Sequence, residues 1–260
     1  MVRRVASLAD LVRRERYPRS SRYDPAWLLA LDMGPHPLWQ LEDLLDGIDL
    51  NANSVVLDLG AGMGATSVFL AREYGCEVVS LDLWVSEEER RAVLESAGVA
   101  HRVRVIADDI RTAVLEDDVY NAIVSVDAFE YFGTDTRFLP HLLKALKPGG
   151  LIAMSTPALR HDPYAAAVPA YVAATFGAEA AAWHDPGWWK RHWELTGVVE
   201  NVSARWQQGG RDNWLTWEKV RLSEVGETAP SPVVDMLEAD VDENVGFALV
   251  SARGLASHRL

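Results

Sequence analysis

Short apolar runs recur through the middle of the chain, and most of them end in an acidic or hydroxyl side chain. The runs cover residues 55–59, 77–82, 103–107, 121–127 and 151–155. Such runs are typical of buried strands, and the segments between them carry the spacing of amphipathic helices. These helices are predicted at 65–74, 86–97 and 134–146. Strands that alternate with helices predict an α/β fold with a parallel sheet covered by helices on both faces.

The first run leads directly into a glycine-rich turn. Asp58 lies near the end of the run, and Gly60, Gly62 and Gly64 follow before the next helical pattern begins. Glycine allows a tight turn and a close approach of a ligand to the backbone, because it has no Cβ. The start of the following helix leaves N–H groups without partners. A strand, a glycine loop and a helix in this order predict a site for a nucleotide-like ligand.

Two kinds of nucleotide fit this loop. Gly60, Gly62 and Ala65 satisfy the dinucleotide fingerprint, with Asp82 at the position of a ribose-binding acid. Asp58 favours the other kind, because a carboxylate beside the loop repels a pyrophosphate and attracts a cation. S-adenosylmethionine has no phosphate and carries a sulfonium and an ammonium group, so Asp58 favours it over NAD.

Later elements follow the same order. Asp82 and Asp127 end the second and fourth runs, Asp108 and Asp109 follow the third, and a Lys-Pro-Gly-Gly turn at 147–150 precedes the fifth. From about Val55 to Thr156 the series resembles the class I S-adenosylmethionine-dependent methyltransferases. The resemblance implies a Rossmann-like, seven-stranded, mostly parallel sheet whose last strand is antiparallel. S-adenosylmethionine is the implied cofactor.

The resemblance also implies a cofactor site along the carboxyl ends of the strands. Asp58 and the glycine loop are expected at the methionine part, Asp82 at the ribose hydroxyls, and Asp109, rather than Asp108, at the adenine amino group. Ser125 and Asp127 are expected below the point of methyl transfer. The complete expected set is Asp58, Gly60, Ala61, Gly62, Asp82, Leu83, Trp84, Asp109, Ile110, Ser125 and Asp127.

Four side chains are candidates for catalysis. Glu130 and Tyr131 occupy the place where similar enzymes often carry a Glu-His or His-His pair, so Glu130 is either a general base or a residue that holds a helix end. His36 and His184 lie in segments expected to fold over the site, and each is either a base or a surface or capping residue. No spacing of His, Cys or acidic residues indicates a metal site.

Two segments are expected around the cofactor domain of residues 51–260. Residues 1–50 form a helical lead-in or cap, and residues 157–197 form a helical, tryptophan-rich lid insertion. Seven of the ten tryptophans lie between Trp183 and Trp217. They either form an aromatic wall that selects an amine by cation–π contact or pack the lid onto the sheet, and packing is favoured. Residues 227–232 are expected to form a loop. The patterns at 34–39 and 184–197 resemble a bacterial, cyclopropane-fatty-acid-synthase-like subgroup.

Charge and composition exclude several classes of protein. The net charge is −13 and the pI about 4.9, which disfavours nucleic acid as a partner. No apolar run is long enough to cross a membrane, and no signal peptide is evident at the N-terminus, so a cytoplasmic enzyme is expected. The single cysteine, Cys76, excludes a disulfide framework and a Cys-ligated cluster, and with it radical chemistry.

The expected function is methyl transfer from S-adenosylmethionine to an N, O or C nucleophile of a small molecule. Three alternatives stay open. One is alkene alkylation, as in cyclopropane formation, and another is a non-catalytic subunit that binds S-adenosylmethionine. A NAD-dependent dehydrogenase is the last.

Overall fold

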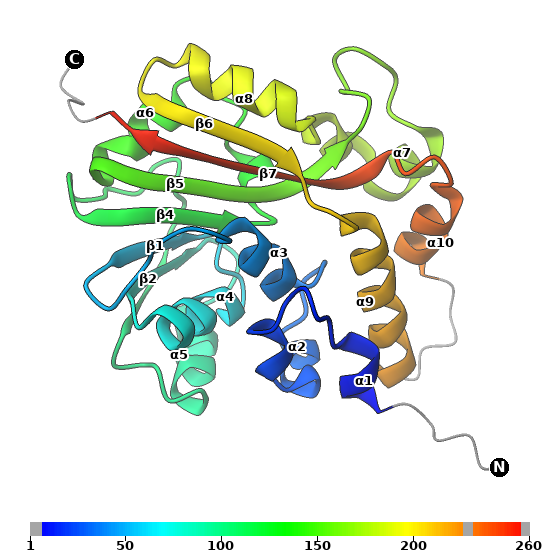
Figure 1. Cartoon of the computed structure of the whole chain (residues 1–260), viewed down its shortest axis with the longest axis horizontal. Helices are drawn as coiled ribbons and strands as arrows, with labels where there is room; N and C mark the ends of the chain where they lie inside the picture. Colours follow the sequence, from blue (N-terminus) through cyan, green and yellow to red (C-terminus); the bar gives the residue numbers. More distant parts are fainter. Residues whose placement is uncertain (1–6, 226–230, 256–260) are drawn as a thin grey trace.

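A seven-stranded mixed sheet forms the centre of the computed structural model, which describes residues 7–225 and 231–255 (Figure 1). The order of its strands is β3-β2-β1-β4-β5-β7-β6. Strands β1 to β5 pair in parallel, and β7 is antiparallel to both neighbours. The predicted α/β sheet with an antiparallel last strand is therefore confirmed. The strands are β1 (Val55–Leu59), β2 (Glu77–Asp82), β3 (Val103–Ala107), β4 (Tyr120–Val126), β5 (Leu146–Leu159), β6 (Val199–Trp206) and β7 (Val245–Gly254).

Helices cover both faces of this sheet, as a doubly wound fold requires. They are α1 (Leu8–Val12), α2 (Pro25–Ala30), α3 (Pro37–Leu44), α4 (Ala65–Phe69), α5 (Glu87–Ser96), α6 (Phe138–Leu142), α7 (Ala170–Phe176), α8 (Pro186–Leu195), α9 (Gly210–Val225) and α10 (Pro232–Ala239). Shorter helical turns are η1 (Ser20–Arg22), η2 (Leu70–Tyr74), η3 (Phe129–Tyr131), η4 (Leu143–Ala145) and η5 (Gly177–Ala182). The loop expected at 227–232 falls mostly outside the described residues.

Alternation along the strands divides the core between the two faces. Val56 packs into a cluster with residues of α3, α4 and α9, whereas its neighbour Leu57 packs into a second cluster with residues of α6 and α8. Successive side chains of a strand point to opposite faces, so both faces of β1 are buried. Asp58, which follows in the same strand, is also buried.

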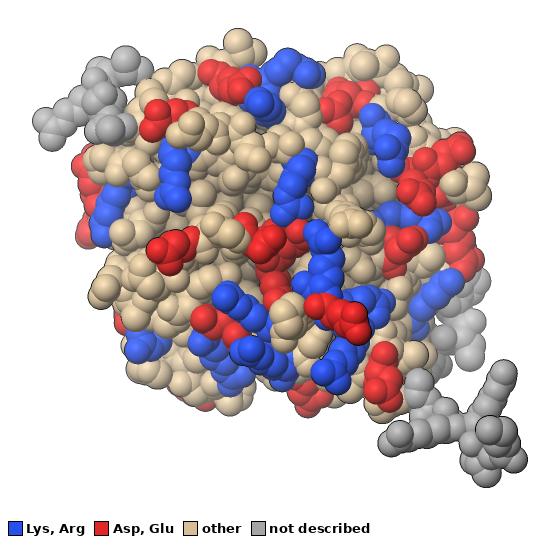
Figure 2. All heavy atoms as spheres, in the orientation of Figure 1, with Lys and Arg blue, Asp and Glu red and all other residues tan. Residues whose placement is uncertain are grey.

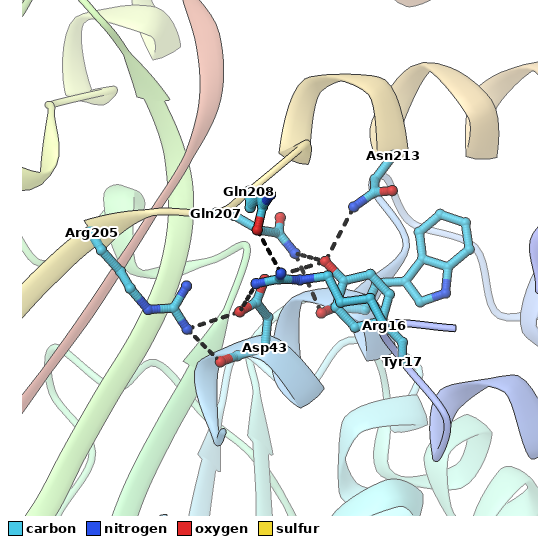
Figure 3. A network of polar contacts seen from close by, with 8 residues as sticks. Arg16, Tyr17, Asp43, Arg205, Gln207, Gln208 and Asn213 are labelled. Atoms are coloured by element: carbon cyan, nitrogen blue, oxygen red, sulfur yellow. Dashed lines mark hydrogen bonds and ion pairs between the residues drawn. The ribbon is translucent and has the colours of Figure 1, made fainter. Parts of the chain in front are cut away.

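A buried carboxylate links the N-terminal segment to the sheet through polar contacts (Figure 3). Asp43, near the end of α3, has a side chain that is only 2% exposed and forms ion pairs with Arg16 at 3.1 Å and Arg205 at 2.8 Å. Tyr17 donates a hydrogen bond to the same carboxylate at 3.2 Å and accepts one from Asn213 of α9 at 3.3 Å. Elements from the two ends of the chain therefore share one polar network.

Two predicted boundaries were wrong. The helix expected over 134–146 begins only at Phe138, because Pro140 lacks an N–H donor and fits only the first turn of a helix. The Lys-Pro-Gly-Gly segment is not a turn before the fifth strand but an irregularity inside β5, which already begins at Leu146. The positive φ of Gly149, +72°, accommodates this distortion.

The tryptophan-rich region packs the fold together, as the favoured interpretation held. Trp189 and Trp193 of α8 join the core on one face of the sheet, and Trp183 and Trp214 form a separate cluster with α7 and α10. Trp217 packs into the opposite face. Helix α8 lies along β6 and β7, so this part of the expected lid is a layer of the core.

Candidate functional site

Two adjoining cavities lie where β1, β2 and β4 end. The larger has a volume of about 260 Å³ and the smaller about 120 Å³. The residues that line both are Gly60, Asp82, Trp84, Ala128 and Tyr131. Because they share these walls, the two cavities form one elongated site at the carboxyl edge of the parallel strands, where open α/β sheets bind ligands.

The glycine loop forms the floor between the two cavities. Gly60 and Gly62 have φ values of +72° and +52°, a region that other residues rarely occupy. A Cβ on Gly60 would lie 2.3 Å from the Cβ of Ala128, and one on Gly62 would lie 2.9 Å from Sδ of Met33. Close packing and backbone conformation both require Gly60, whereas Gly62 is required by its backbone conformation, because the flexible Met33 side chain could move aside. Ala61, between them, donates its N–H to the carbonyl of Leu81 at 3.1 Å.

Asp58 lies beneath the loop and lines neither cavity. Its Oδ2 accepts hydrogen bonds from Thr66 at 2.7 Å and Ser67 at 2.5 Å, at the start of α4. Its Oδ1 is buried and has no hydrogen-bond partner among the described residues. Burial raises the pKa of Asp58 to about 6. Asp58 therefore holds the start of α4 and places a carboxyl group under the loop.

Asp82 connects the two ends of the site. Its Oδ2 accepts from the N–H of Gly62 at 2.8 Å, and its Oδ1 accepts from the N–H groups of Trp84 and Val85 at 2.7 and 2.9 Å. A carboxylate has about four acceptor positions, so these bonds leave one for a further donor. Leu83 and Trp84 are 53% and 67% exposed, which gives the larger cavity an apolar rim.

Asp109 reaches the larger cavity, but its carboxylate is already paired. It accepts hydrogen bonds from the side chain of Arg111 on both oxygens, at 2.9 and 2.6 Å, and Arg111 lowers its pKa. Asp108 lines the same wall and uses Oδ1 to accept the N–H of Asp109 at 2.7 Å. Ile110 is buried beside them. An adenine amino group would therefore compete with Arg111 for Asp109, which the sequence did not reveal.

Asp127 lines the smaller cavity at the end of β4. Its φ is +56°, an uncommon value for a residue other than glycine, and its buried Oδ1 has no hydrogen-bond partner within the described part of the chain. Burial raises its pKa well above the ordinary value, and the negative charge of Glu130 raises it further. Ser125, two residues earlier, is buried and lines neither cavity.

Glu130 and Tyr131 lie beside Asp127 on η3. Glu130 is 3% exposed and accepts a hydrogen bond of 2.6 Å from Thr156. Burial raises its pKa to about 7. The hydroxyl of Tyr131 donates to Glu179 at 3.2 Å, and its ring meets that of Trp84 edge to face at 5.1 Å. Tyr131 therefore lines both cavities, whereas Glu130 is buried behind them and lines neither.

The two candidate histidines lie outside both cavities, and His36 takes the capping role that the sequence left open. His36 caps α3, because its Nδ1 accepts the N–H of Trp39 at 3.2 Å, and burial lowers its pKa to about 3. His184 lies 2.9 Å from Asp162 through Nδ1 and stacks on Trp188 at 3.6 Å. Neither histidine lines the two cavities, because each ring is enclosed by packing.

The α2–α3 connection covers the glycine loop, and Leu31, Met33, Gly34 and Pro35 line the smaller cavity. The sequence indicated a segment over the site but did not single out Met33. Asp32, in the same connection, accepts a hydrogen bond of 2.7 Å from the indole of Trp217. Glu179 was also missed, because no motif marks a lone acidic residue in an alanine-rich turn.

The surface away from the site carries charges of both signs. Figure 2 shows Lys and Arg interspersed with Asp and Glu on one face of the molecule. Within residues 7–225 and 231–255, the structure contains no helix that is long and apolar enough to cross a membrane. The absence of a nucleic acid partner stays a prediction.

The sheet order, the antiparallel last strand and the glycine loop at the carboxyl edge define a Rossmann-like domain of the class I methyltransferase type. The chain belongs to the mycolic acid cyclopropane synthetase family, which residues 38–173, just over half of the sequence, match. The predicted resemblance to methyltransferases with a cyclopropane-synthase-like domain is confirmed.

Curated relatives match the central part of the chain. A sarcosine/dimethylglycine N-methyltransferase of Halorhodospira halochloris is 32% identical over 114 residues, which is 44% of this chain and 41% of that protein. A glycine/sarcosine/dimethylglycine N-methyltransferase of Actinopolyspora halophila is 31% identical over 111 residues, 42% of this chain and 20% of that protein. The match thus spans between a fifth and two fifths of these relatives.

Solved structures share the fold over nearly the whole chain. Phosphoethanolamine N-methyltransferase 2 of Haemonchus contortus, in complex with phosphomonomethylethanolamine and S-adenosylhomocysteine, superposes with a TM-score of 0.71. The superposition covers 96% of this chain and 61% of that one, at 17% identity. At this identity the likeness establishes the fold.

Proposed function

We propose that the protein transfers a methyl group from S-adenosylmethionine to a small-molecule acceptor. The observation that carries the proposal is the single elongated site formed by the two cavities. Its wider end, beside Asp82 and Ile110, suits an adenosine, and its narrower end joins the glycine loop to Asp127. Family membership and the names of the relatives support the same activity.

The residues present fit this cofactor. Asp82 keeps one acceptor position for a ribose hydroxyl, and Trp84 and Leu83 offer apolar surface to a base. The Gly60–Gly62 backbone gives close access for the methionine part, with the buried carboxyl of Asp58 beneath it. When bound, S-adenosylmethionine supplies a methyl group already activated by a positively charged sulfonium.

The chain then has three tasks, which its residues can perform. The α2–α3 connection excludes water from the glycine loop through Met33. The acceptor is positioned at the narrow end between Asp127 and Tyr131. A proton released by the acceptor can pass to Asp127, which lines the narrow end and whose pKa is raised by burial. Glu130, next to Asp127, has a pKa of about 7 and can take part in holding that proton.

Calorimetric titration tests the cofactor. We expect S-adenosylmethionine and S-adenosylhomocysteine to bind and NADH not to bind. Asp82→Ala should abolish binding, and Trp84→Ala, which removes no backbone hydrogen bond, should weaken it. Asp212→Ala, at a position 68% exposed on α9, is the matched control. Binding of NADH in place of S-adenosylmethionine would return the chain to the dehydrogenases, and binding of neither would reject the proposal.

Family membership also favours a second reaction, alkylation of an alkene with ring closure. A donor with a fully deuterated methyl group separates the two. Simple methyl transfer keeps every deuteron in the product, whereas cyclopropane formation loses one. Mass spectrometry of products from amine, alcohol and alkene acceptors therefore assigns the reaction. A binding-competent protein that gives no product with any acceptor would indicate a non-catalytic subunit.

A further inference from the structure

Carboxyl groups surround the narrow end of the site. Asp127 lines the cavity itself, and Glu130 lies next to it on η3. Glu179 of η5 accepts the hydrogen bond of Tyr131. The pKa of the Tyr131 phenol is raised by burial and then by these three carboxyl groups, so all of them lie close to one ring. Three different segments of the chain contribute the negative groups.

Acidic neighbours dominate the electrostatic environment of Asp127. The charged groups that act on its pKa are Glu130, Glu179 and Asp32, and all of them raise it. Arg221, which lies 3.6 Å from Asp32, also pairs with Glu218 at 3.1 Å. Glu130 receives only a neutral donor, the hydroxyl of Thr156. The narrow end of the site therefore gathers acidic groups without a basic partner among the groups that act on Asp127, and a cation bound there would favour their ionised forms.

Asp127 also has an acceptor that the described residues leave unused. Its Oδ1 is buried and without a hydrogen-bond partner, although the residue forms part of the cavity wall. Leaving a buried polar atom unpaired costs free energy, and a buried charge costs far more. A ligand that brings both positive charge and N–H donors to this atom would remove both costs.

We propose that the methyl acceptor is a cationic amine, held by Asp127 and flanked by Glu130 and Glu179. This inference rests on the proposed function and adds the class of substrate to it. The faces of Tyr131 and Trp84, whose rings are 5.1 Å apart at the mouth, add cation–π attraction for the same charge. An alcohol or an alkene carries no positive charge that would favour the ionised form of these carboxyl groups.

The transfer is balanced with the groups present. The ammonium first gives one proton to the carboxylate of Asp127, which lines the cavity. The freed lone pair of the nitrogen then forms the N–C bond while the C–S bond of the sulfonium breaks, and its electrons remain on sulfur. The products are a methylated ammonium and a neutral thioether, and the carboxyl group later releases its proton to solvent.

Binding of cationic amines in the absence of turnover tests the inference. Tetramethylammonium, choline and methylammonium, the last of which carries N–H donors, are titrated in the presence of saturating S-adenosylhomocysteine, which supplies no methyl group. For choline the uncharged isostere 3,3-dimethylbutan-1-ol is titrated in parallel. We expect at least one of the cations to bind. If choline is the cation that binds, its affinity should be roughly tenfold or more above that of its uncharged isostere. Asp127→Asn should remove the binding or the preference.

Two further variants keep the test decisive. Glu179→Gln, on a separate turn, should weaken binding of the cation without affecting binding of S-adenosylhomocysteine. Asp135→Asn, at a side chain 49% exposed and paired with Arg137, should change neither affinity. If S-adenosylhomocysteine itself fails to bind, the proposed function is rejected. If it binds but no cation binds, or the cations bind equally to wild type and Asp127→Asn, only the amine inference is overturned.

Discussion

The hydroxyl of Thr156 lies 2.6 Å from Oε2 of Glu130, so a neutral donor from β5 stabilises the ionised form of a buried acid. Burial works in the opposite direction and is the larger effect, because the pKa of Glu130 is raised to about 7. The proton affinity of Glu130 is therefore set by a balance that a single hydroxyl can change.

Thr156→Val should raise the pKa of Glu130 further. A hydrogen bond to a carboxylate is worth about 1 kcal/mol or somewhat more, which corresponds to roughly one pH unit. If Glu130 is the base, the acid limb of the kcat/KM profile should move to higher pH by about this amount. Carboxyl NMR titration measures the same shift without turnover. Thr175→Val, away from the site, is the control, and an unchanged or lowered pKa would contradict the prediction.

Glu130 should also make stability depend on pH. Its pKa in the folded state is about 7, against an ordinary value of 4.5, so the folded state binds the proton more tightly than the unfolded state. The stability it contributes is full below pH 4.5 and is lost as the pH rises to 7. In urea unfolding, the free energy of unfolding of Glu130→Gln should therefore rise relative to that of wild type across this window, by on the order of 2–3 kcal/mol. Glu95→Gln, exposed on α5, should show no such gain.

Gly60→Ala separates steric overlap from backbone strain. Gly64 has a φ of +92° and no heavy atom within 4 Å of the place that a Cβ would take, so Gly64→Ala carries strain alone, about 1–2 kcal/mol. Gly60→Ala adds the overlap with Ala128 and should lose more stability and most of the affinity for S-adenosylhomocysteine. The double variant with Ala128→Gly should recover the excess. Equal losses at both glycines would show that the contact with Ala128 is unimportant.

Asp43→Ala should destabilise the protein by about 2–3 kcal/mol. The carboxylate is almost fully buried, while its two arginine partners are partly exposed and can regain water when it is removed. Chemical denaturation compares this variant with Asp46→Ala, an exposed position two residues after α3. A loss no larger than that of the control would mean that the network contributes little to the fold.

Two tryptophan variants should differ in their effects, one on stability and the other on cofactor binding. Trp193→Ala should cost about 3–5 kcal/mol, because the side chain is fully buried in the core under α8. Trp84→Ala should change stability by less than about 0.5 kcal/mol, since the side chain is 67% exposed, but weaken cofactor binding. Thermal unfolding and calorimetry on both variants check this, and the reverse pattern would restore the aromatic-wall hypothesis for the region around α8.

The sheet and its ligand-binding edge could be predicted because their signals are local. Apolar runs that end at Asp82 and Asp127, and a glycine loop after β1, report the strands and their shared edge without any knowledge of the tertiary structure. The sequence says least about a residue whose role depends on a neighbour in space. Arg111 forms an ion pair with Asp109. Trp39 stacks on His36, and Trp188 stacks on His184. None of these contacts can be seen from the order of residues.

The covering of the site was the least predictable part. Met33 and Glu179 carry no motif. Met33 lines the smaller cavity and Glu179 contacts Tyr131 only because the α2–α3 connection and η5 are placed by contacts with distant elements. The assignment of residues 1–50 and 157–197 as separate units stays a prediction. In the structure the described residues of both segments pack into the cores that the sheet shares with its helices.

The hydrogen bond between Asp32 and Trp217 joins residues 185 positions apart. The glycine loop, β1 and β2 leave the ribosome early, but the connection that covers them gains this anchor only after α9 has been synthesised. The α2–α3 connection can become ordered through this contact only after the long stretch of chain between Asp32 and Trp217 has closed into a loop. The entropic cost of that closure comes before the contacts that offset it. The entrance to the site is thus completed late in folding, although the residues that form it are among the first to be made.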